Sequence, residues 1–313
     1  MIHISAAQIQ ESNQFDTLIE SLRIGFRNDI ETPMRHHHDY ANPKESQDST
    51  LLLMPSWEAG QNLGVKIVTV SPDNGKHDLP SIQGVYLLFD AHKGEPKALL
   101  DGKSLTVKRT AAASALASSY LSSPNASKLL MIGTGALSPN LIEAHCSQRP
   151  IDHVYVWGRN LKKAEAVVNQ LRHLNITIKA ISDIDKFIPK ADIISCATLS
   201  QTPLIKGKLL RNGQHIDLVG SYKKDTREAD NNVILRSTVF VDTFQGGLNE
   251  SGDIVIPLKE GIIKEDDVVA DLFSLCKNEH PGRNTQQEIT VFKSVGHASE
   301  DLIAANYFYN NLH

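Results

Sequence analysis

The sequence predicts an α/β protein with two domains, one built on a parallel sheet and the other of mixed α+β type. After about residue 128, short apolar runs alternate with helical segments, which is typical of a parallel sheet covered by helices on both faces. Before residue 105, apolar runs follow one another closely and turn residues separate them, which favours an antiparallel meander. A length of 313 residues also exceeds the usual size of one core.

Four strands are expected in the first domain, over residues 51–54, 64–70, 84–90 and 98–101. Turn-forming clusters at 71–75 and 90–96 separate them. An alanine-rich segment over 106–121 has no interior glycine or proline, so it is predicted to be a helix leading into the second domain.

The second domain is expected to alternate strands with helices. Strands are predicted at 128–132, 154–157, 177–180, 191–197, 215–219 and 239–241, and helices at 141–146, 162–174 and 184–188. A last strand over 288–293 and a helix over 298–309 are expected to return to the first domain. The predicted domains are therefore 1–108 with 288–313, and 109–287.

A tight turn of small residues follows the first strand of the second domain. Gly133 lets the chain turn sharply, and the missing side chain of Gly135 lets backbone N–H groups approach a pyrophosphate at the start of a helix. Ser138 replaces the third glycine of the usual pattern, but the strand, turn and helix around it favour a dinucleotide site of the Rossmann type.

The second strand of this domain ends in Gly158, Arg159 and Asn160, where an NAD site usually carries an acid for the ribose hydroxyls. Here that acid is absent. A guanidinium binds a ribose 2′-phosphate that a carboxylate would repel, so Arg159 predicts that NADPH is accepted as a cofactor, and NADH remains a second expected cofactor with no preference between them.

Three cations are candidates for chemistry. Lys66 lies within an apolar strand, on the same face as Val68 and Val70, where a lysine is costly unless paired; the alternative is an outward-facing lysine on an edge strand. Arg109 begins the alanine-rich helix, where the helix dipole disfavours it, so a partner such as a substrate carboxylate is expected, with a surface ion pair as the alternative. Arg35, after a proline and a methionine, is the third.

Composition excludes several classes of partner. A net charge of −4 without a basic stripe argues against nucleic acid, and no apolar run approaches the ~20 residues that span a bilayer. The start of the chain lacks the features of a secretory signal. The three cysteines, Cys146, Cys196 and Cys276, are widely spaced in apolar contexts, which predicts free thiols and a cytoplasmic location.

No metal site is expected. His36, His37 and His38 are consecutive, so their side chains point in different directions and cannot converge on one ion. The spacing of four further acids specifies no chemistry by itself: Asp217, Asp242, Asp271 and Asp301. Patterns of serine hydrolases, zinc peptidases, P-loop proteins and dithiol oxidoreductases are missing from the sequence.

Seven segments, taken together and in order, resemble the ornithine cyclodeaminase/mu-crystallin family: residues 33–35, 65–69, 84–90, 109–114, 133–136, 157–160 and 293–296. The resemblance implies a homodimer in which each subunit pairs a substrate-binding and dimerisation domain with a Rossmann domain for NAD(P). It also implies that Arg35, Lys66 and Arg109 face the substrate. The cofactor contacts that it implies are Ser81, Ala136, Leu137, Thr198, Val219 and Ser294.

One departure from the family bears on the reaction. The cyclodeaminases follow a Val-Gly-Gly sequence with an aspartate that handles the substrate amine, whereas residues 219–222 here are Val-Gly-Ser-Tyr. Residues 215–222 and 227–230 are instead similar to the branch that reduces cyclic ketimines. The expected reaction is NAD(P)H-dependent reduction of 1-pyrroline-2-carboxylate to L-proline, and of 1-piperideine-2-carboxylate to L-pipecolate. Arg35 and Arg109 would hold the substrate carboxylate, and Lys66 would act as the catalytic residue beside the C=N bond.

Two alternatives stay open from the sequence. The first is an ornithine cyclodeaminase or an NAD-dependent amino-acid dehydrogenase. The second is a mu-crystallin-like protein that binds a nucleotide and a small ligand without turnover.

Overall fold

The computed structural model describes residues 1–12 and 14–312. The chain divides into two compact units, which are described separately below. The first unit comprises Met1–Arg109 together with the segment from Ala298 onward, and the second comprises Thr110–His297. The predicted return of the chain end to the first unit is therefore observed for the final helix.

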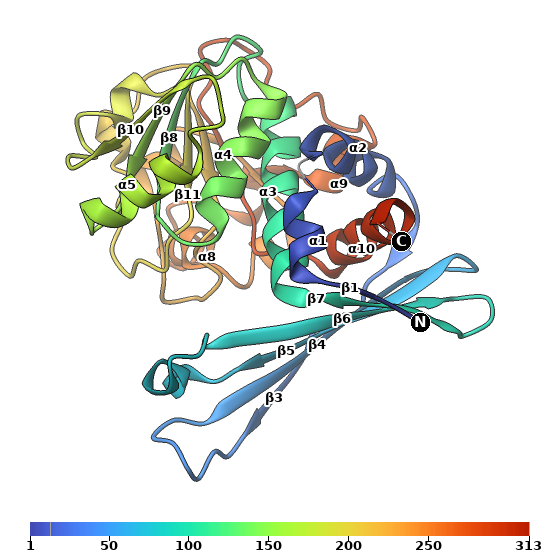
Figure 1. Cartoon of the computed structure of the whole chain (residues 1–313). Coiled ribbons are helices and arrows are strands. Elements are labelled where there is room, and N and C mark those ends of the chain that lie inside the picture. Colours follow the sequence, from blue (N-terminus) through green and yellow to red (C-terminus); the bar gives the residue numbers. More distant parts are fainter. Residues whose placement is uncertain (13, 313) are drawn as a thin grey trace. The chain divides into compact units, whose positions relative to one another are not determined.

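The first unit is built on one sheet with the strand order β1-β7-β6-β5-β4-β2, and β3 also pairs with β4 (Figure 1). Its strands are β1 (Ile2–Ile4), β2 (Ile30–Glu31), β3 (His36–Tyr40), β4 (Ser49–Glu58), β5 (Asn62–Val70), β6 (Ile82–Asp90) and β7 (Pro96–Asp101). Strands β4 to β7 form the predicted antiparallel meander, each longer than or equal to its expected range. The central strand β5 lies between β4 and β6 and carries Lys66.

Helices cover one face of this sheet (Figure 1). They are α1 (Ala6–Glu11), α2 (Phe15–Gly25) and α10 (Ala298–Leu312), and η1 (Pro72–His77) is a short 3₁₀ helix in the β5–β6 connection. Helix α10 contacts β4, β5, β6 and α2. On the covered face Met54, Lys66, Tyr86 and Leu100 lie opposite one another in register and are buried.

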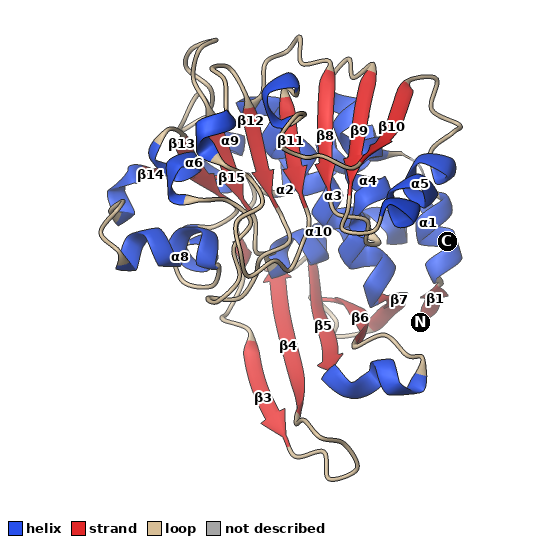
Figure 2. Cartoon of the chain, turned by 90° about the vertical axis from the view of Figure 1, so that its left-hand side faces the viewer, coloured by secondary structure: helices blue, strands red, loops and turns tan. Residues whose placement is uncertain are grey.

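The second unit holds an eight-stranded parallel sheet with the order β10-β9-β8-β11-β12-β15-β13-β14 (Figure 2). Its strands are β8 (Lys128–Ile132), β9 (His153–Trp157), β10 (Thr177–Ile181), β11 (Ile193–Cys196), β12 (His215–Leu218), β13 (Thr238–Val241), β14 (Val268–Asp271) and β15 (Thr290–Lys293). The order reverses between β8 and β11, which is the point where Rossmann-type sheets bind their ligand, beyond the carboxyl ends of the strands.

The remaining helices are α3 (Gly102–Leu121), which passes from the first unit into the second, and those of the second unit. The latter are α4 (Leu137–Gln148), α5 (Leu161–Gln170), α6 (Asn231–Leu235), α7 (Phe244–Gly247), α8 (Gly252–Lys259) and α9 (Leu272–Cys276), with 3₁₀ segments η2 (Ile188–Lys190), η3 (Gly207–Leu209) and η4 (Glu265–Asp267). The α/β class and the parallel sheet are confirmed.

Two sequence predictions need correction. The strand near residue 290 does not join the first unit: β15 pairs with β12 and β13 inside the parallel sheet. All four of its residues are buried, as suits an interior strand covered on both faces, so the second unit extends to His297 rather than to residue 287. The predicted helix over 184–188 is replaced by the 3₁₀ segment η2, because Pro189 restricts the residue before it and has no N–H to donate.

Candidate active site

The turn after β8 has the backbone that a dinucleotide site requires. Gly133 has a φ of 121°, and a Cβ there would lie 2.6 Å from the carbonyl oxygen of Ala197. Its N–H donates to the carbonyl of Trp157 at 2.9 Å, which fixes the turn against the end of β9. A Cβ on Gly135 would instead meet nothing within 4 Å. Gly133 is thus required by the protein itself, whereas Gly135 leaves open space for a ligand.

Helix α4 begins directly after this turn. Ala136 is its N-cap and is exposed, Leu137 is its first residue and is half-buried, and Ser138 is buried in the position of the missing third glycine. The N–H of Ser138 donates to the Gly135 carbonyl at 3.0 Å, and no side chain caps the helix start. A helix start without a side-chain cap suits a phosphate as the acceptor.

A pocket of about 660 Å³ lies at the carboxyl ends of β8, β9 and β11. It is lined by Gly133, Thr134, Trp157, Gly158, Arg159, Ala197, Thr198, Leu199, Ser200, Gln201, Thr202 and Leu204. Arg159 is exposed at this pocket, as a phosphate-binding side chain would be. The glycine turn, the uncapped helix and this pocket fit a dinucleotide.

Asn160 has a structural role that the sequence did not indicate. Its side chain caps α5 by accepting a hydrogen bond from the N–H of Lys162 at 3.0 Å. This contact uses one lone pair of its side-chain oxygen and leaves the side-chain NH₂ group for other contacts.

Three other predicted cofactor residues follow neighbouring strands. Thr198 comes after β11, Val219 after β12, and Ser294 after β15. The N–H of Val219 donates to Cys196 and the N–H of Ser294 to Leu218, so the three positions lie in sequence along one sheet edge. The structure brings them to the same edge as the glycine turn.

Sequence reasoning missed the side chain that joins these strand ends. The Glu228 carboxylate accepts four hydrogen bonds: from Thr198 N–H (2.7 Å) and hydroxyl (3.0 Å), and from the N–H groups of Gly220 (2.8 Å) and Ser221 (3.2 Å). Burial raises the pKa of Glu228 to about 7, and the nearby Lys293 ammonium, 3.8 Å away, opposes that shift. Its segment was noticed only as a family resemblance, since no local pattern marks an acid that serves distant strand ends.

The first unit contains a buried cluster of charges. The Lys66 ammonium lies 2.7 Å from the Asp301 carboxylate, and Arg109 donates to Asp301 at 2.9 Å and to Glu300 at 2.6 Å. Lys66 is 3 % exposed and Arg109 is 5 % exposed, and both acids are fully buried. The alternatives of an edge lysine and a surface ion pair are therefore both wrong.

Arg109 does not begin its helix, contrary to the sequence prediction. Helix α3 begins at Gly102, so Arg109 lies two turns inside it, where the dipole has little effect. The partners that hold the arginine are carboxylates of α10. Its Nη2 has no hydrogen bond to any of the residues described, so this nitrogen remains available to a ligand.

The protonation of Lys66 is sensitive to its surroundings. Burial lowers the pKa of Lys66 to about 8; Asp301 opposes this shift, and the charges of Arg109 and Arg35 add to it. Arg35, half-buried just before β3, is thus close enough to act on Lys66. Burial also raises the pKa of Tyr86, directly opposite Lys66 on β6, well above its usual value.

Several cations gather at this cluster. Lys66 and Arg109 share the buried carboxylates of Glu300 and Asp301, and the charge of Arg35 also acts on Lys66. Positive groups so close together favour a small carboxylate placed among them. The cluster can therefore bind a small anion and hold a proton at Lys66 Nζ beside it.

Ser81 belongs to the first unit. It is exposed in the loop before β6 of the first unit, and its carbonyl accepts from the N–H of Ser71 at 2.8 Å. The other cofactor predictions all lie in the second unit.

Other sequence expectations concern metals and membranes. Within residues 1–12 and 14–312, no group of three or more His, Cys, Asp or Glu side chains could hold a metal ion, and His36–His38 lie along exposed strand β3. No described helix is both long and apolar enough to cross a bilayer.

Comparison with known proteins identifies the class. The model of the ornithine cyclodeaminase/mu-crystallin family matches residues 2–313, so the chain belongs to this family. A curated relative, the Delta(1)-pyrroline-2-carboxylate reductase of Colwellia psychrerythraea, is 40 % identical over 97 % of this chain and 96 % of its own.

Two solved structures extend the comparison. The Delta(1)-pyrroline-2-carboxylate reductase of Thermococcus litoralis, in complex with NADH and L-proline, is 35 % identical with a TM-score of 0.92, over 99 % of this chain and 97 % of the other. The iminosuccinate reductase of Paracoccus denitrificans, in complex with NAD⁺, is 25 % identical with a TM-score of 0.87, over 97 % and 94 % of the two chains.

Proposed function

We propose that this chain is an NAD(P)H-dependent reductase of cyclic ketimines, which converts 1-pyrroline-2-carboxylate to L-proline and 1-piperideine-2-carboxylate to L-pipecolate. The observation that carries the proposal is the buried cluster of Lys66 and Arg109 with the charge of Arg35 acting on it, which suits a small carboxylate next to a group that protonates. In this proposal the first unit binds substrate and the second binds the dinucleotide. The reductases of Colwellia psychrerythraea and Thermococcus litoralis support the substrate class.

Each charged residue then has a separate task. Arg109 binds the substrate carboxylate through Nη2, while Asp301 and Glu300 fix its other nitrogens. Arg35 supplies the second positive charge for the carboxylate. Lys66 holds a proton at Nζ near the imine nitrogen, since an ammonium with a pKa near 8 is mostly charged at neutral pH and gives up its proton easily. When bound, a reduced nicotinamide would supply the hydride for the imine carbon, and Lys66 would supply the proton for the nitrogen.

The segment after β12 disfavours a cyclodeaminase. The Ser221 side chain is fully buried, and its hydroxyl contacts the Thr226 and Ser251 hydroxyls, at 2.9 and 3.1 Å. Tyr222 follows it, so the segment offers no carboxylate for a substrate amine. No observation favours an open-chain amino acid over a cyclic imine.

Purified protein should oxidise NADPH or NADH rapidly when 1-pyrroline-2-carboxylate or 1-piperideine-2-carboxylate is added, as followed by nicotinamide absorbance. Ornithine with NAD⁺ should give little or no reaction. Faster turnover of ornithine would overturn the proposal in favour of a cyclodeaminase. Nucleotide binding without turnover of either imine would instead indicate a mu-crystallin-like binding protein.

We propose that NADPH is an accepted cofactor, because Arg159 lines the pocket of the second unit. The acid that many NAD sites carry at this point would repel the 2′-phosphate of NADPH, whereas an arginine can bind it. Replacing Arg159 with alanine should raise the Michaelis constant for NADPH and leave that for NADH nearly unchanged. The expected loss is on the order of 1.5–3 kcal/mol for a charge-assisted contact to phosphate. Lys163→Ala, on the exposed side of the neighbouring helix, is the control. Equal weakening of both cofactors would contradict the assignment.

We propose that the first unit forms a homodimer through the sheet face opposite its helices. Eleven side chains on this face are apolar, and none of them is fully buried: Leu51, Leu53, Pro55, Trp57, Leu63, Val65, Ile67, Val85, Leu87, Phe89 and Leu99. A sheet face with this many apolar side chains is covered in a stable protein, and twofold pairing is the simplest way to cover it.

Sedimentation at micromolar concentration should therefore give about twice the 34.5 kDa mass of the chain. Leu87→Asp should shift the protein toward monomer, whereas Leu235→Asp, at an exposed site in the second unit, should not. A stable wild-type monomer would argue against this interface.

A cytoplasmic location is also proposed. None of the three cysteines forms a disulfide within the described residues, two of them are buried, and burial raises the pKa values of Cys146 and Cys196. Thiols that form no disulfide and ionise poorly suit a reducing compartment.

A further inference from the structure

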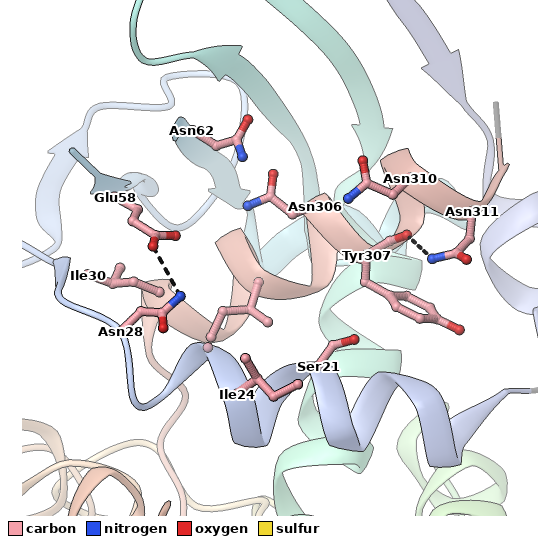
Figure 3. A pocket seen from close by; sticks show the side chains of 12 residues that line it. Ser21, Ile24, Asn28, Ile30, Glu58, Asn62, Asn306, Tyr307, Asn310 and Asn311 are labelled. Carbon is pink, nitrogen blue, oxygen red and sulfur yellow. Dashed lines mark hydrogen bonds between the residues drawn. The ribbon is translucent and has the colours of Figure 1, made fainter. Parts of the chain in front are cut away.

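We propose that the first unit carries a second ligand site, distinct from the charged cluster of the proposed reductase, that binds a small organic ammonium ion. The site is a pocket of about 370 Å³ between α2, α10 and the adjoining ends of β2, β4 and β5. None of the residues assigned to substrate or cofactor lines it. Figure 3 shows Glu58, Asn28, Asn62 and Asn306 near one another, with Ile24 on the adjacent helix α2.

Glu58 gives the pocket its charge. Its carboxylate accepts one hydrogen bond, from the side-chain amide of Asn28 at 3.0 Å. It is half-buried, and no lysine, arginine or histidine of the described chain forms an ion pair with it. A half-buried carboxylate without a counter-cation attracts a positively charged ligand.

Asparagine side chains supply the other polar groups. Asn306 and Asn310 lie one turn apart on α10, and neither side chain hydrogen-bonds to another described residue. Asn62 accepts from Lys97 at 2.9 Å, which leaves its amide nitrogen unused. Figure 3 places Asn62 and Asn306 on the same side of the pocket as Glu58. Their amide oxygens and nitrogens can bind N–H or polar groups of a ligand without adding charge.

The remaining wall is apolar and closely packed. Ile24, Ile30 and Ile303 line it. A Cβ atom at Gly25 would lie only 2.5 Å from the Ile303 side chain. Helices α2 and α10 therefore approach each other closely at this glycine. An alkyl chain fits against this wall while its charged end lies at Glu58, so the ligand class is an aliphatic amine or an amino acid.

The test uses n-butylammonium chloride as probe on the whole protein with ¹³C-labelled isoleucine δ1-methyl groups. The Ile24, Ile30 and Ile303 signals should shift and saturate with the probe. Butan-1-ol, a neutral molecule of similar shape, should bind at least about tenfold more weakly. Sodium butyrate should leave the three signals unchanged. L-2-Aminobutyrate separates the two sources of ammonium: shifts with it as well as with butylammonium indicate an amino-acid site, and shifts with butylammonium alone indicate an amine site.

Glu58→Gln keeps the hydrogen bond from Asn28 and removes the charge, so it should weaken butylammonium binding at least about tenfold. Glu11→Gln, at an exposed acid of the same unit, is the matched control and should leave binding unchanged. Reductase turnover should stay normal in both variants, which separates this proposal from that of the proposed function. The proposal is overturned if the three signals do not move, if butanol binds equally well, or if Glu58→Gln binds as the wild type does.

Discussion

Replacing Lys66 with methionine is expected to lower kcat/KM for 1-pyrroline-2-carboxylate by about 10²-fold or more, while the protein still folds and binds NADPH. Methionine keeps the apolar stem and removes the proton and charge that the proposed mechanism places beside the imine. Asp301 keeps Arg109 as a partner in this variant, so the fold should survive. Steady-state kinetics and a cofactor titration measure the two properties separately.

Lys97→Met is a matched control. Lys97 lies on β7 of the same sheet and donates a hydrogen bond to Asn62, outside the charged cluster. It should retain nearly full activity. Wild-type turnover by Lys66→Met would end the catalytic assignment of Lys66 and leave Arg35 and Arg109 to be tested alone.

The pH profile gives an independent readout of the same residue. Since burial lowers the pKa of Lys66 to about 8, the free enzyme loses the ammonium as the pH rises through that value, and kcat/KM should fall with it. A bound carboxylate favours the charged form, so the corresponding fall in kcat should occur at higher pH. The Met variant should lack this step; if the step persists there, it belongs to the substrate imine.

Asp301→Asn is expected to reduce the free energy of unfolding by about 3–5 kcal/mol, the usual cost of leaving buried charges without their partner. The change removes the carboxylate that pairs with both Lys66 and Arg109. The thermal midpoint should fall by roughly 5–15 °C. Calorimetry on the wild type and the variant measures this loss.

Asp29→Asn, at an exposed acid of the same unit, should leave the midpoint unchanged. Asp301 also raises the pKa of Lys66, so any residual activity of Asp301→Asn should be lost at lower pH than in the wild type. An unchanged midpoint together with an unchanged pH profile would contradict the role given to Asp301.

The sequence predicted those parts of the molecule whose causes are local. Strands β4 to β7 follow from alternating apolar residues and turn clusters, and strand β8 has its predicted bounds. Gly133 was identified because a sharp turn needs a residue that tolerates positive φ. Lys66 could be selected because a lysine in an apolar strand needs a partner.

Local sequence patterns could not predict which residues pair with Lys66 and Arg109. Arg109 and Asp301 are 192 positions apart, and Asp301 was grouped with acids of unspecified role. One sequence feature indicated their burial. Glu300 and Asp301 lie in the first turn of a helix whose other residues are largely apolar, and in the structure both acids are buried. The position of β15 was missed for the same reason, because a short buried strand does not indicate which sheet it joins.

The division of the first unit between the two ends of the chain has a consequence for the order of folding. The second unit is one continuous segment, whereas the first needs α10, whose Ala298 carbonyl accepts from Ser56, 242 positions earlier. During synthesis, β5 and the start of α3 therefore emerge long before the acids that neutralise Lys66 and Arg109. Contacts so distant in sequence form late and slowly. Until the last helix is synthesised, Lys66 and Arg109 of the nascent first unit remain exposed to water, so the site proposed to bind substrate is the last part of this unit to form.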